Sequence, residues 1–244
     1  MNPVTAIPLI LLALHGLALV LGAGMLAWMI TLHRRARRAE AAAPAQPELP
    51  SFQLTFAPRP ATWLAIRSQN PKAVHTALGL DQFVPFPWLK GSAGGRGFFI
   101  GPPVNGWIIV TGASLPDPGN DPDACFRFLT GLSRRLGQVQ FFQAEQVLHH
   151  HAWVRVENGI VQRAYAWATE AVWNQGERTA AEIDLSMKCF GYGERPFADS
   201  WAASEWMATN VAKVPLLAAR WSLDPARIDV RLRKHADGIA GDPL

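Results

Sequence analysis

The sequence predicts an α+β protein in which an N-terminal transmembrane helix is followed by a single soluble domain with a mainly antiparallel sheet. Three observations predict this fold class. An uncharged and almost wholly apolar run occupies residues 4–32. Short strand patterns alternate with two capped helical patterns over residues 62–142. Asn158-Gly159 then joins two further strand patterns as the tight turn of a hairpin.

The apolar run from Val4 to Leu32 predicts a membrane anchor. A bilayer core of about 30 Å needs about 20 apolar helical residues, and this run exceeds that length. A buried helix of a soluble protein rarely runs this far without a charge. A cleaved signal peptide carries basic residues before its apolar region, whereas none precedes this one. We therefore expect the run to be retained as a single span.

The basic residues after the run predict which side of the membrane the domain occupies. They are Arg34, Arg35, Arg37 and Arg38. Because basic residues that flank a span stay on the cytoplasmic side, we expect the N-terminus outside and the C-terminal domain in the cytoplasm. The same four arginines are predicted to contact anionic lipid headgroups.

Composition divides the 244 residues into four parts. Residues 1–33 form the transmembrane anchor with a short N-terminus, residues 34–60 a basic and then Ala/Pro-rich linker, residues 61–230 the soluble α+β domain and residues 231–244 a flexible tail. The formal net charge is +4, of which residues 1–40 supply +3, which leaves +1 for the remainder. A domain with so little positive charge is not predicted to bind nucleic acid.

Within the domain, the order strand, helix, strand, strand, helix, strand predicts a split βαβ, ferredoxin-like sheet. The strands are expected at residues 62–66, 97–101, 106–111 and 139–142. The first helix begins at Asn70-Pro71 and ends at residue 80, and the second begins at Asp121-Pro122 and ends at Gly137. Residues 81–97 are expected to form a loop. An added hairpin and C-terminal helices at residues 179–190 and 203–221 complete the domain, with Pro215 kinking or breaking the last helix.

The hairpin predicts a strand register because Asn158-Gly159 supplies the positive φ values of a two-residue turn. In that register Val154 pairs with Arg163, which places Arg163 on an apolar face together with Tyr165 and Trp167. An unpaired buried charge is strongly destabilising, so Arg163 must have a partner or lie at a wet edge. It either binds an anionic ligand or a partner's carboxylate, or it pairs within the chain with Glu177, Glu182 or Asp184.

A second candidate surface follows the hairpin, where Trp173-Asn174-Gln175-Gly176-Glu177 combines a large aromatic residue with amide side chains at a predicted turn. We interpret it as the rim of a partner or ligand site, with a tryptophan that closes the core as the alternative. The predicted binding residues are therefore Arg163, Tyr165, Trp167, Trp173, Asn174 and Glu177.

The sequence contains no motif for a catalytic nucleophile or a cofactor: GxSxG, HExxH, the P-loop and the dinucleotide-binding fingerprint are all missing. His149-His150-His151 resembles a metal site, but adjacent residues of an extended strand point to opposite faces and nothing supplies further ligands. Cys125 and Cys189 are expected to be buried thiols, with a disulfide as the alternative. We predict no catalytic residue, no metal and no cofactor.

Several short patterns together resemble those of a group of uncharacterised bacterial proteins. They are the Ala152-Trp153 pair, Arg163-Ala164-Tyr165-Ala166, the segment from Trp173 to Glu177, and Trp221-Ser222-Leu223-Asp224-Pro225. The resemblance covers roughly residues 61–229 and implies a bacterial source and a recurring domain. It implies no activity and no catalytic residue, and the membrane anchor is not part of the shared pattern.

These observations lead to three functional hypotheses. The first is a single-pass protein of the bacterial inner (cytoplasmic) membrane whose cytoplasmic domain binds a protein or peptide partner. It is favoured by the missing catalytic motifs and by the tryptophans, of which all but Trp28 lie in the domain. The alternatives are a membrane-tethered enzyme of the hydrolase type, with Cys125, a histidine and Asp184, and a small-ligand sensor that uses Arg163.

Overall fold

The computed structural model describes residues 59–91, 97–194, 201–229, 232 and 236–243. The predicted span, the arginines that follow it and nearly all of the linker lie outside these residues and stay predictions. Within the described ranges, no helix has the length and hydropathy needed to cross a bilayer.

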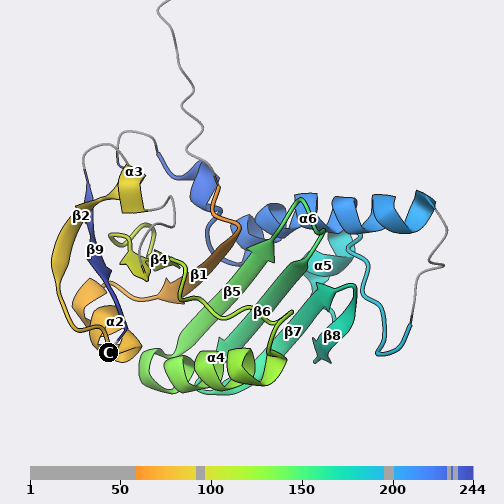
Figure 1. Ribbon diagram of the computed structural model, residues 1–244, viewed down its shortest axis with the longest axis horizontal. Helices are drawn as coiled ribbons and strands as arrows, with labels where there is room; N and C mark the ends of the chain where they lie inside the picture. Colours follow the sequence, from red (N-terminus) through yellow and green to blue (C-terminus); the bar gives the residue numbers. More distant parts are fainter. Residues whose placement is uncertain (1–58, 92–96, 195–200, 230–231, 233–235, 244) are drawn as a thin grey trace, which may run out of the picture. The chain divides into compact units, whose positions relative to one another are not determined.

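The described strands form one antiparallel sheet with the order β2-β9-β3-β4-β1-β5-β6-β7-β8 (Figure 1). The strands are β1 (Thr62–Arg67), β2 (Val84–Pro87), β3 (Phe98–Ile100), β4 (Trp107–Thr111), β5 (Gln138–Ala144), β6 (His151–Glu157), β7 (Ile160–Ala168), β8 (Glu170–Gln175) and β9 (Asp237–Gly241). The helices are α2 (Pro71–Leu78), α3 (Trp88–Gly91), α4 (Pro122–Leu136), α5 (Ala180–Asp184), α6 (Trp201–Trp221) and the 3-10 turn η1 (Pro225–Arg227). The predicted α+β class is confirmed.

The four strands at the centre of the sheet have the order β3-β4-β1-β5. β4 lies between β1 and β3 and is antiparallel to both, and β5 flanks β1 on its other side. The predicted capping signals act as expected: Asn70 Oδ1 accepts hydrogen bonds from the first turn of α2, and Gly79 ends that helix with a φ of 66°. Asp121 likewise caps α4.

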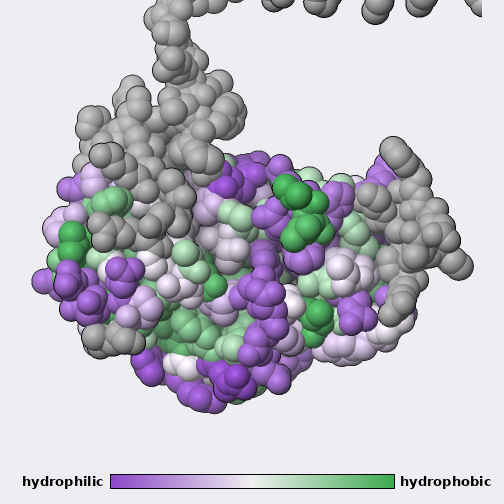
Figure 2. Space-filling view, in the orientation of Figure 1, coloured by the Kyte–Doolittle hydropathy of each residue, from purple (hydrophilic) through white to green (hydrophobic). Residues whose placement is uncertain are grey.

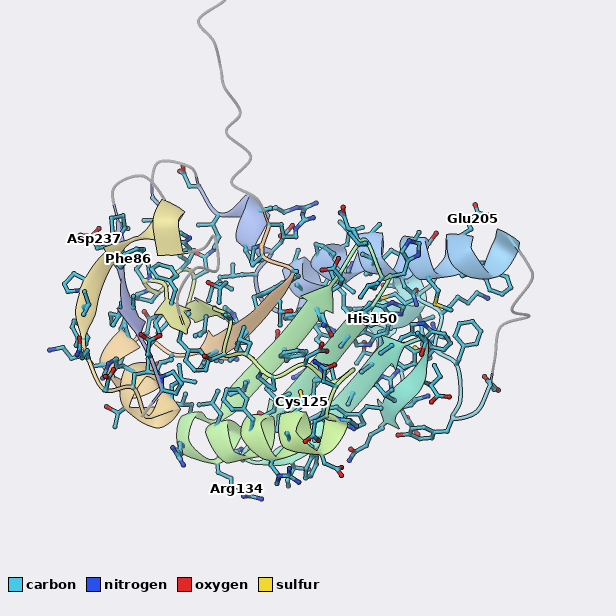
Figure 3. The ribbon with its side chains drawn as sticks, in the orientation of Figure 1. Phe86, Cys125, Arg134, His150, Glu205 and Asp237 are labelled. Carbon is cyan, nitrogen blue, oxygen red and sulfur yellow. The ribbon has the colours of Figure 1, made fainter. Side chains whose placement is uncertain are left out.

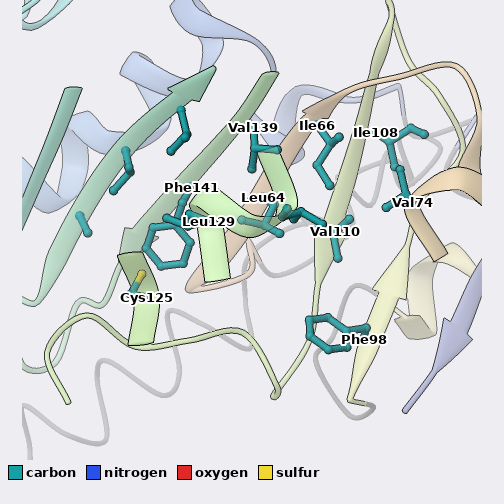
Figure 4. Close-up of a cluster of buried hydrophobic side chains, with 14 of the residues drawn as sticks. Leu64, Ile66, Val74, Phe98, Ile108, Val110, Cys125, Leu129, Val139 and Phe141 are labelled. Atoms are coloured by element: carbon teal, nitrogen blue, oxygen red, sulfur yellow. The ribbon is translucent and has the colours of Figure 1, made fainter. Parts of the chain in front are cut away.

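Both faces of the sheet are covered by helices. The face under α2 and α4, named the α4 face, carries Leu64 and Phe141 packed against Leu129 (Figure 4). The opposite face lies under α5 and α6 and is named the α6 face; it carries Trp63 and Phe142, whose rings stack with centroids 5.3 Å apart. Successive residues of each central strand therefore enter different cores, as the two-residue period of a strand requires.

The hairpin register differs from the predicted one. β6 and β7 pair as expected beside the turn, but a β-bulge lies between Arg155 and Val156. Arg163 therefore pairs with Arg155, and the predicted pairing with Val154 is wrong. Because a shift of one residue moves a side chain to the other face, Arg163 lies on the α6 face beside Tyr165 and away from the valines.

The C-terminal segment departs most from the prediction. Residues 231–244 were expected to form a flexible tail, but they contain β9, which pairs with β2 and β3 inside the sheet. The predicted loop at residues 81–97 contains β2 and the short helix α3. Gly238 permits the close approach of β9 to β3, because a Cβ at this position would clash with the carbonyl oxygen of Ile100 and the ring of Phe99.

Three elements near the end of the chain also differ from expectation. The predicted turn around Trp173 is the end of strand β8. The helix predicted at residues 179–190 is limited to α5, Ala180–Asp184. Helix α6 continues through Pro215 rather than ending there. The proline removes one backbone donor from the helix, and its side chain is buried.

Candidate functional site

A buried network centred on Arg163 joins the hairpin to α5. The side chains of Arg163 and Glu182 are 1% and 0% exposed, and Arg163 Nε lies 2.9 Å from Glu182 Oε1. The remaining guanidinium nitrogens also donate within the chain, to the carbonyl oxygens of Ala164, Gln175 and Gly176, to Asn174 Oδ1 and to Cys189 Sγ. Of the alternatives for Arg163, the structure shows the internal pair, with Glu182 as its partner.

Glu182 is engaged on both carboxylate oxygens. Oε1 also accepts a hydrogen bond from Trp153 Nε1 at 2.8 Å. Oε2 accepts from the backbone N–H and the hydroxyl of Thr179 at 2.8 Å and 2.9 Å, which completes the capping box of α5. One carboxylate therefore ties β6, β7 and α5 together. Removing either member of such a buried pair costs about 3–5 kcal/mol.

Side chains around this network hold the segment that follows α5. The backbone N–H of Phe190 donates to Tyr165 Oη at 3.0 Å, and its carbonyl oxygen accepts from Asn174 Nδ2 at 3.1 Å. The amide of Asn210 bonds both backbone groups of Lys188, at 3.0 Å and 2.7 Å. Side chains from β7, β8 and α6 thus take the place of a neighbouring strand and satisfy this segment's backbone.

His151 is a buried imidazole at the start of β6. Its Nδ1 lies 2.9 Å from the carbonyl oxygen of His149, and its Nε2 lies 3.1 Å from Asn210 Nδ2. Because the amide nitrogen of Asn210 is a donor, Nε2 must accept and the proton must sit on Nδ1. Burial lowers the pKa of His151 to about 4, which matches this neutral form.

The six predicted binding residues do not form one surface. Four of them are buried: Arg163, Tyr165, Trp167 and Trp173. Trp173 packs on the α4 face, while the other three belong to the α6 face. Asn174 is half-buried and Glu177 is exposed. A contact surface requires accessible side chains, so the four buried residues serve the interior of the domain.

The residues suggested for a hydrolase-type enzyme lie apart. Cys125 is buried on the α4 face, where desolvation raises its pKa to about 12. His151 stacks with Tyr165 on the opposite side of the sheet. Asp184 forms a surface pair with Arg220 at 3.1 Å.

The second thiol, Cys189, lacks the lowered pKa of an activated nucleophile. Desolvation raises the pKa of Cys189 to about 11, so its thiol stays protonated at neutral pH. Cys125 and Cys189 are both free thiols. Among the described residues, no group of three or more metal-ligating side chains is found.

An open groove lies at the other end of the sheet, beside strand β2, which contains Phe86, and strand β9, which contains Asp237 (Figure 3). We name it the β2–β9 groove. Its volume is about 390 Å³, and its lining includes Pro71, Phe83, Pro85, Pro102 and Ile239. Phe83 is 47% exposed.

The position of Phe83 is set by side chains of α2. The ring of Phe83 lies 5.6 Å from the ring of His75. The ammonium group of Lys72 lies 5.9 Å from the centroid of the Phe83 ring. These contacts hold a large aromatic side chain at the mouth of the groove.

Both edges of the sheet are protected against the addition of a further strand. The N–H of Trp88 donates to the carbonyl oxygen of Ala236, just before β9. Because backbone groups of a strand alternate in direction, the positions of β2 that face away from β9 are Pro85 and Pro87. Proline has no N–H, so these positions cannot donate to a further strand. On β8, a bulge interrupts the ladder. The N–H of Asn174 donates to Tyr192 Oη at 2.8 Å, and the Tyr192 hydroxyl donates back to the Asn174 carbonyl at 3.3 Å.

Sequence reasoning missed three features of these sites. The Thr-x-x-Glu spacing from Thr179 to Glu182 is the signature of a capping box, and it would have predicted that the Glu182 carboxylate bonds the start of α5. The roles of Asn210 and Tyr192 depend on contacts with distant segments and have no local signal. Because prolines are uncommon in strands, residues 84–87 were predicted as a loop. The edge strand β2, which forms one wall of the groove, was therefore missed.

Comparison of the chain with protein-family models, with curated proteins and with solved structures finds no match. The resemblance to a group of uncharacterised bacterial proteins therefore stays a prediction.

Proposed function

We propose that this chain is a membrane-tethered binding module. The helix from Val4 to Leu32 anchors it in a bacterial cytoplasmic membrane with the N-terminus outside. The α+β domain then binds a protein or peptide partner in the cytoplasm. The observation that carries the binding role is the β2–β9 groove, an apolar hollow of about 390 Å³ with an accessible aromatic side chain at its mouth.

The chemistry of the groove suits a peptide segment with an apolar anchor residue. Phe83, Pro85 and Pro102 supply apolar walls, and large apolar anchors in such pockets dominate the affinity of many interfaces. Lys72 and Asp237 lie exposed along the same lining. One positive and one negative side chain can pair with charged groups of either sign that flank the anchor residue.

The packing behind the groove supports a site that exists before the partner binds. β2 and β9 pair over four residue positions, from Val84–Ala240 to Pro87–Asp237. Phe83 rests on α2. A pre-organised site loses little conformational entropy on association. Because both sheet edges are protected, side-chain docking in the groove is favoured over strand addition.

The two alternative functions have less support in the described residues. A sensor that reads an anion through Arg163 needs free guanidinium donors, but each nitrogen of Arg163 already donates to the chain itself. A hydrolase needs a thiol beside a base, but Cys125 and His151 lie on opposite faces of the sheet. No specific observation favours either alternative.

We also infer a ferredoxin-like class for the core built from β3, β4, β1, β5, α2 and α4. The strand order and the shared helix face support this inference. The fold class alone does not indicate a function, so the binding role depends on the groove.

Photo-crosslinking from the groove tests the proposal. The full chain is produced in bacterial cells with p-benzoylphenylalanine in place of Phe83. The matched control carries it in place of Ile160, which is 66% exposed at the start of β7. We expect an adduct with one partner from position 83, none from position 160, and loss of the adduct in a Pro102→Glu variant with unchanged thermal stability. Equal adducts from both positions, or none from position 83, would contradict a partner site in the groove.

A further inference from the structure

The turn between β5 and β6 presents two adjacent aliphatic side chains to solvent. Val147 is 84% exposed and Leu148 is 65% exposed. Figure 2 shows a strongly hydrophobic group in the region of this turn, with hydrophilic residues beside it. Single exposed apolar residues are common, but two consecutive branched ones at the tip of a turn form a small apolar projection.

The turn is held in this shape by hydrogen bonds. Glu145 Oε1 accepts from the N–H of Val147 at 2.9 Å. The N–H of Glu145 donates to the carbonyl oxygen of His150 at 2.9 Å. His149 has a φ of 57°, and its carbonyl oxygen accepts from the imidazole of His151. The hydrogen bonds fix the conformation of the turn before any contact forms. The projection therefore loses little conformational entropy when it binds.

The chain enters the domain beside this projection. Arg59 and Pro60 line a hollow of about 390 Å³ together with Val147 of the turn and Pro215 of α6. Arg59 is held there by Asp224, at 3.2 Å and 3.1 Å. Any tether that leads to residue 59 thus reaches the domain on the side that carries the apolar tip.

We propose that Val147 and Leu148 insert into the interfacial layer of the lipid bilayer and dock the domain on the membrane that anchors it. This inference rests on the membrane tether of the proposed function. Residues 34–58, which make up nearly all of the predicted linker of residues 34–60, reach up to about 80 Å when extended at about 3.1 Å per residue. It therefore allows the domain to stand away from the bilayer or to rest on it.

The small size of the projection favours lipid over a protein as its binding partner. A stable protein complex buries about 800 Å² on each partner, and two aliphatic side chains supply only a small part of that area. A tethered domain, in contrast, experiences an effective concentration of about millimolar at its target surface. A weak apolar contact is then sufficient to set its position. A convex tip also suits a deformable lipid interface, whereas a protein partner needs a matching hollow.

Fluorescence quenching by lipid tests this docking with the full chain in vesicles of equal parts phosphatidylcholine and phosphatidylglycerol. An environment-sensitive probe is attached to Val147→Cys and, as the matched control, to Ile160→Cys. The unsubstituted chain serves as the labelling blank, because Cys125 is buried and Cys189 is partly buried. We expect several-fold stronger quenching by nitroxide-labelled lipid at position 147 than at 160, and loss of this difference when Leu148→Asp is added.

Flotation of the vesicles separates the two proposals. If the chain floats but the probe at position 147 is no more quenched than the one at 160, the docking is wrong and the tether stands. If the chain does not float, the tether is wrong, and the docking falls with it. If the probe at position 147 is shielded from water but not quenched by lipid, the tip contacts protein, and lipid is the wrong occupant.

Discussion

Replacement of Arg163 by methionine is expected to destabilise the domain by about 3–5 kcal/mol, because it leaves the Glu182 carboxylate buried without its counter-charge. The two side chains are 1% and 0% exposed and lie 2.9 Å apart, so water cannot compensate. Trp153 and Thr179 still donate to the carboxylate, which places the loss within this range rather than above it. A loss of this size is a large part of the total stability of about 5–15 kcal/mol that small domains have.

A double-mutant cycle measures the pairing itself. Arg163→Met, Glu182→Leu and the double variant are unfolded in denaturant as full chains in detergent, and tryptophan fluorescence follows the transition. We expect a coupling free energy of about 2–3 kcal/mol, because the double variant buries no unpaired charge. The matched control is Arg220→Met, which removes an exposed pair with Asp184 and should change stability by less than about 1 kcal/mol. If Arg163→Met lowers the free energy of unfolding no more than this control does, Arg163 does not stabilise the domain. That result would favour a ligand-binding role for Arg163.

Three further predictions concern acid, the sheet edge and the thiols. Burial lowers the pKa of His151 to about 4 from 6.5, so the contribution of His151 to stability should be present above about pH 6.5 and fall by about 3 kcal/mol as the pH drops to 4, because the unfolded chain takes up the proton first; denaturation of His151→Gln, which lacks this loss, checks it. Pro85→Val with Pro87→Val gives the β2 edge two outward N–H groups and should produce concentration-dependent association in gel filtration, whereas the unchanged edge should not associate. Mass spectrometry with a thiol reagent at neutral pH should find Cys125 unmodified in the folded chain and Cys189 modified slowly, because burial raises both pKa values; rapid modification of Cys125 would show that the α4 face is open.

Local signals in the sequence predict the parts of the fold that depend on neighbours along the chain. Asn70 and Asp121, each before a proline, predict where α2 and α4 begin, because capping involves only the next three residues. Asn158 and Gly159 both have positive φ, of 49° and 81°, as the predicted turn requires.

Features that depend on contacts between distant segments cannot be predicted from such local signals. β9 pairs Ala240 with Val84, and no local pattern identifies such a partner. The bulge between Arg155 and Val156 has no local signal either, because the apolar residues of β7 line both faces of the sheet and fit either register. That bulge moved Arg163 to the α6 face, where Glu182 meets it.

For the candidate site, the sequence indicates which residues need an explanation but not where they lie. An arginine in an apolar strand predicts a partner, and Glu182 was among three acids that suited the role. The exposed or buried state of Trp173 depends on α4, which covers it. The β2–β9 groove depends on four segments that meet only in the folded domain.

The proposed function depends most directly on a tethered domain that faces the cytoplasm. The test uses spheroplasts of bacterial cells that produce the full chain with an epitope at its C-terminus, treated with protease from outside. We predict that the epitope-bearing domain stays intact until the membrane is permeabilised, and that deletion of residues 1–33 releases it to the soluble fraction. Digestion of the domain in intact spheroplasts would contradict the orientation and the cytoplasmic binding role.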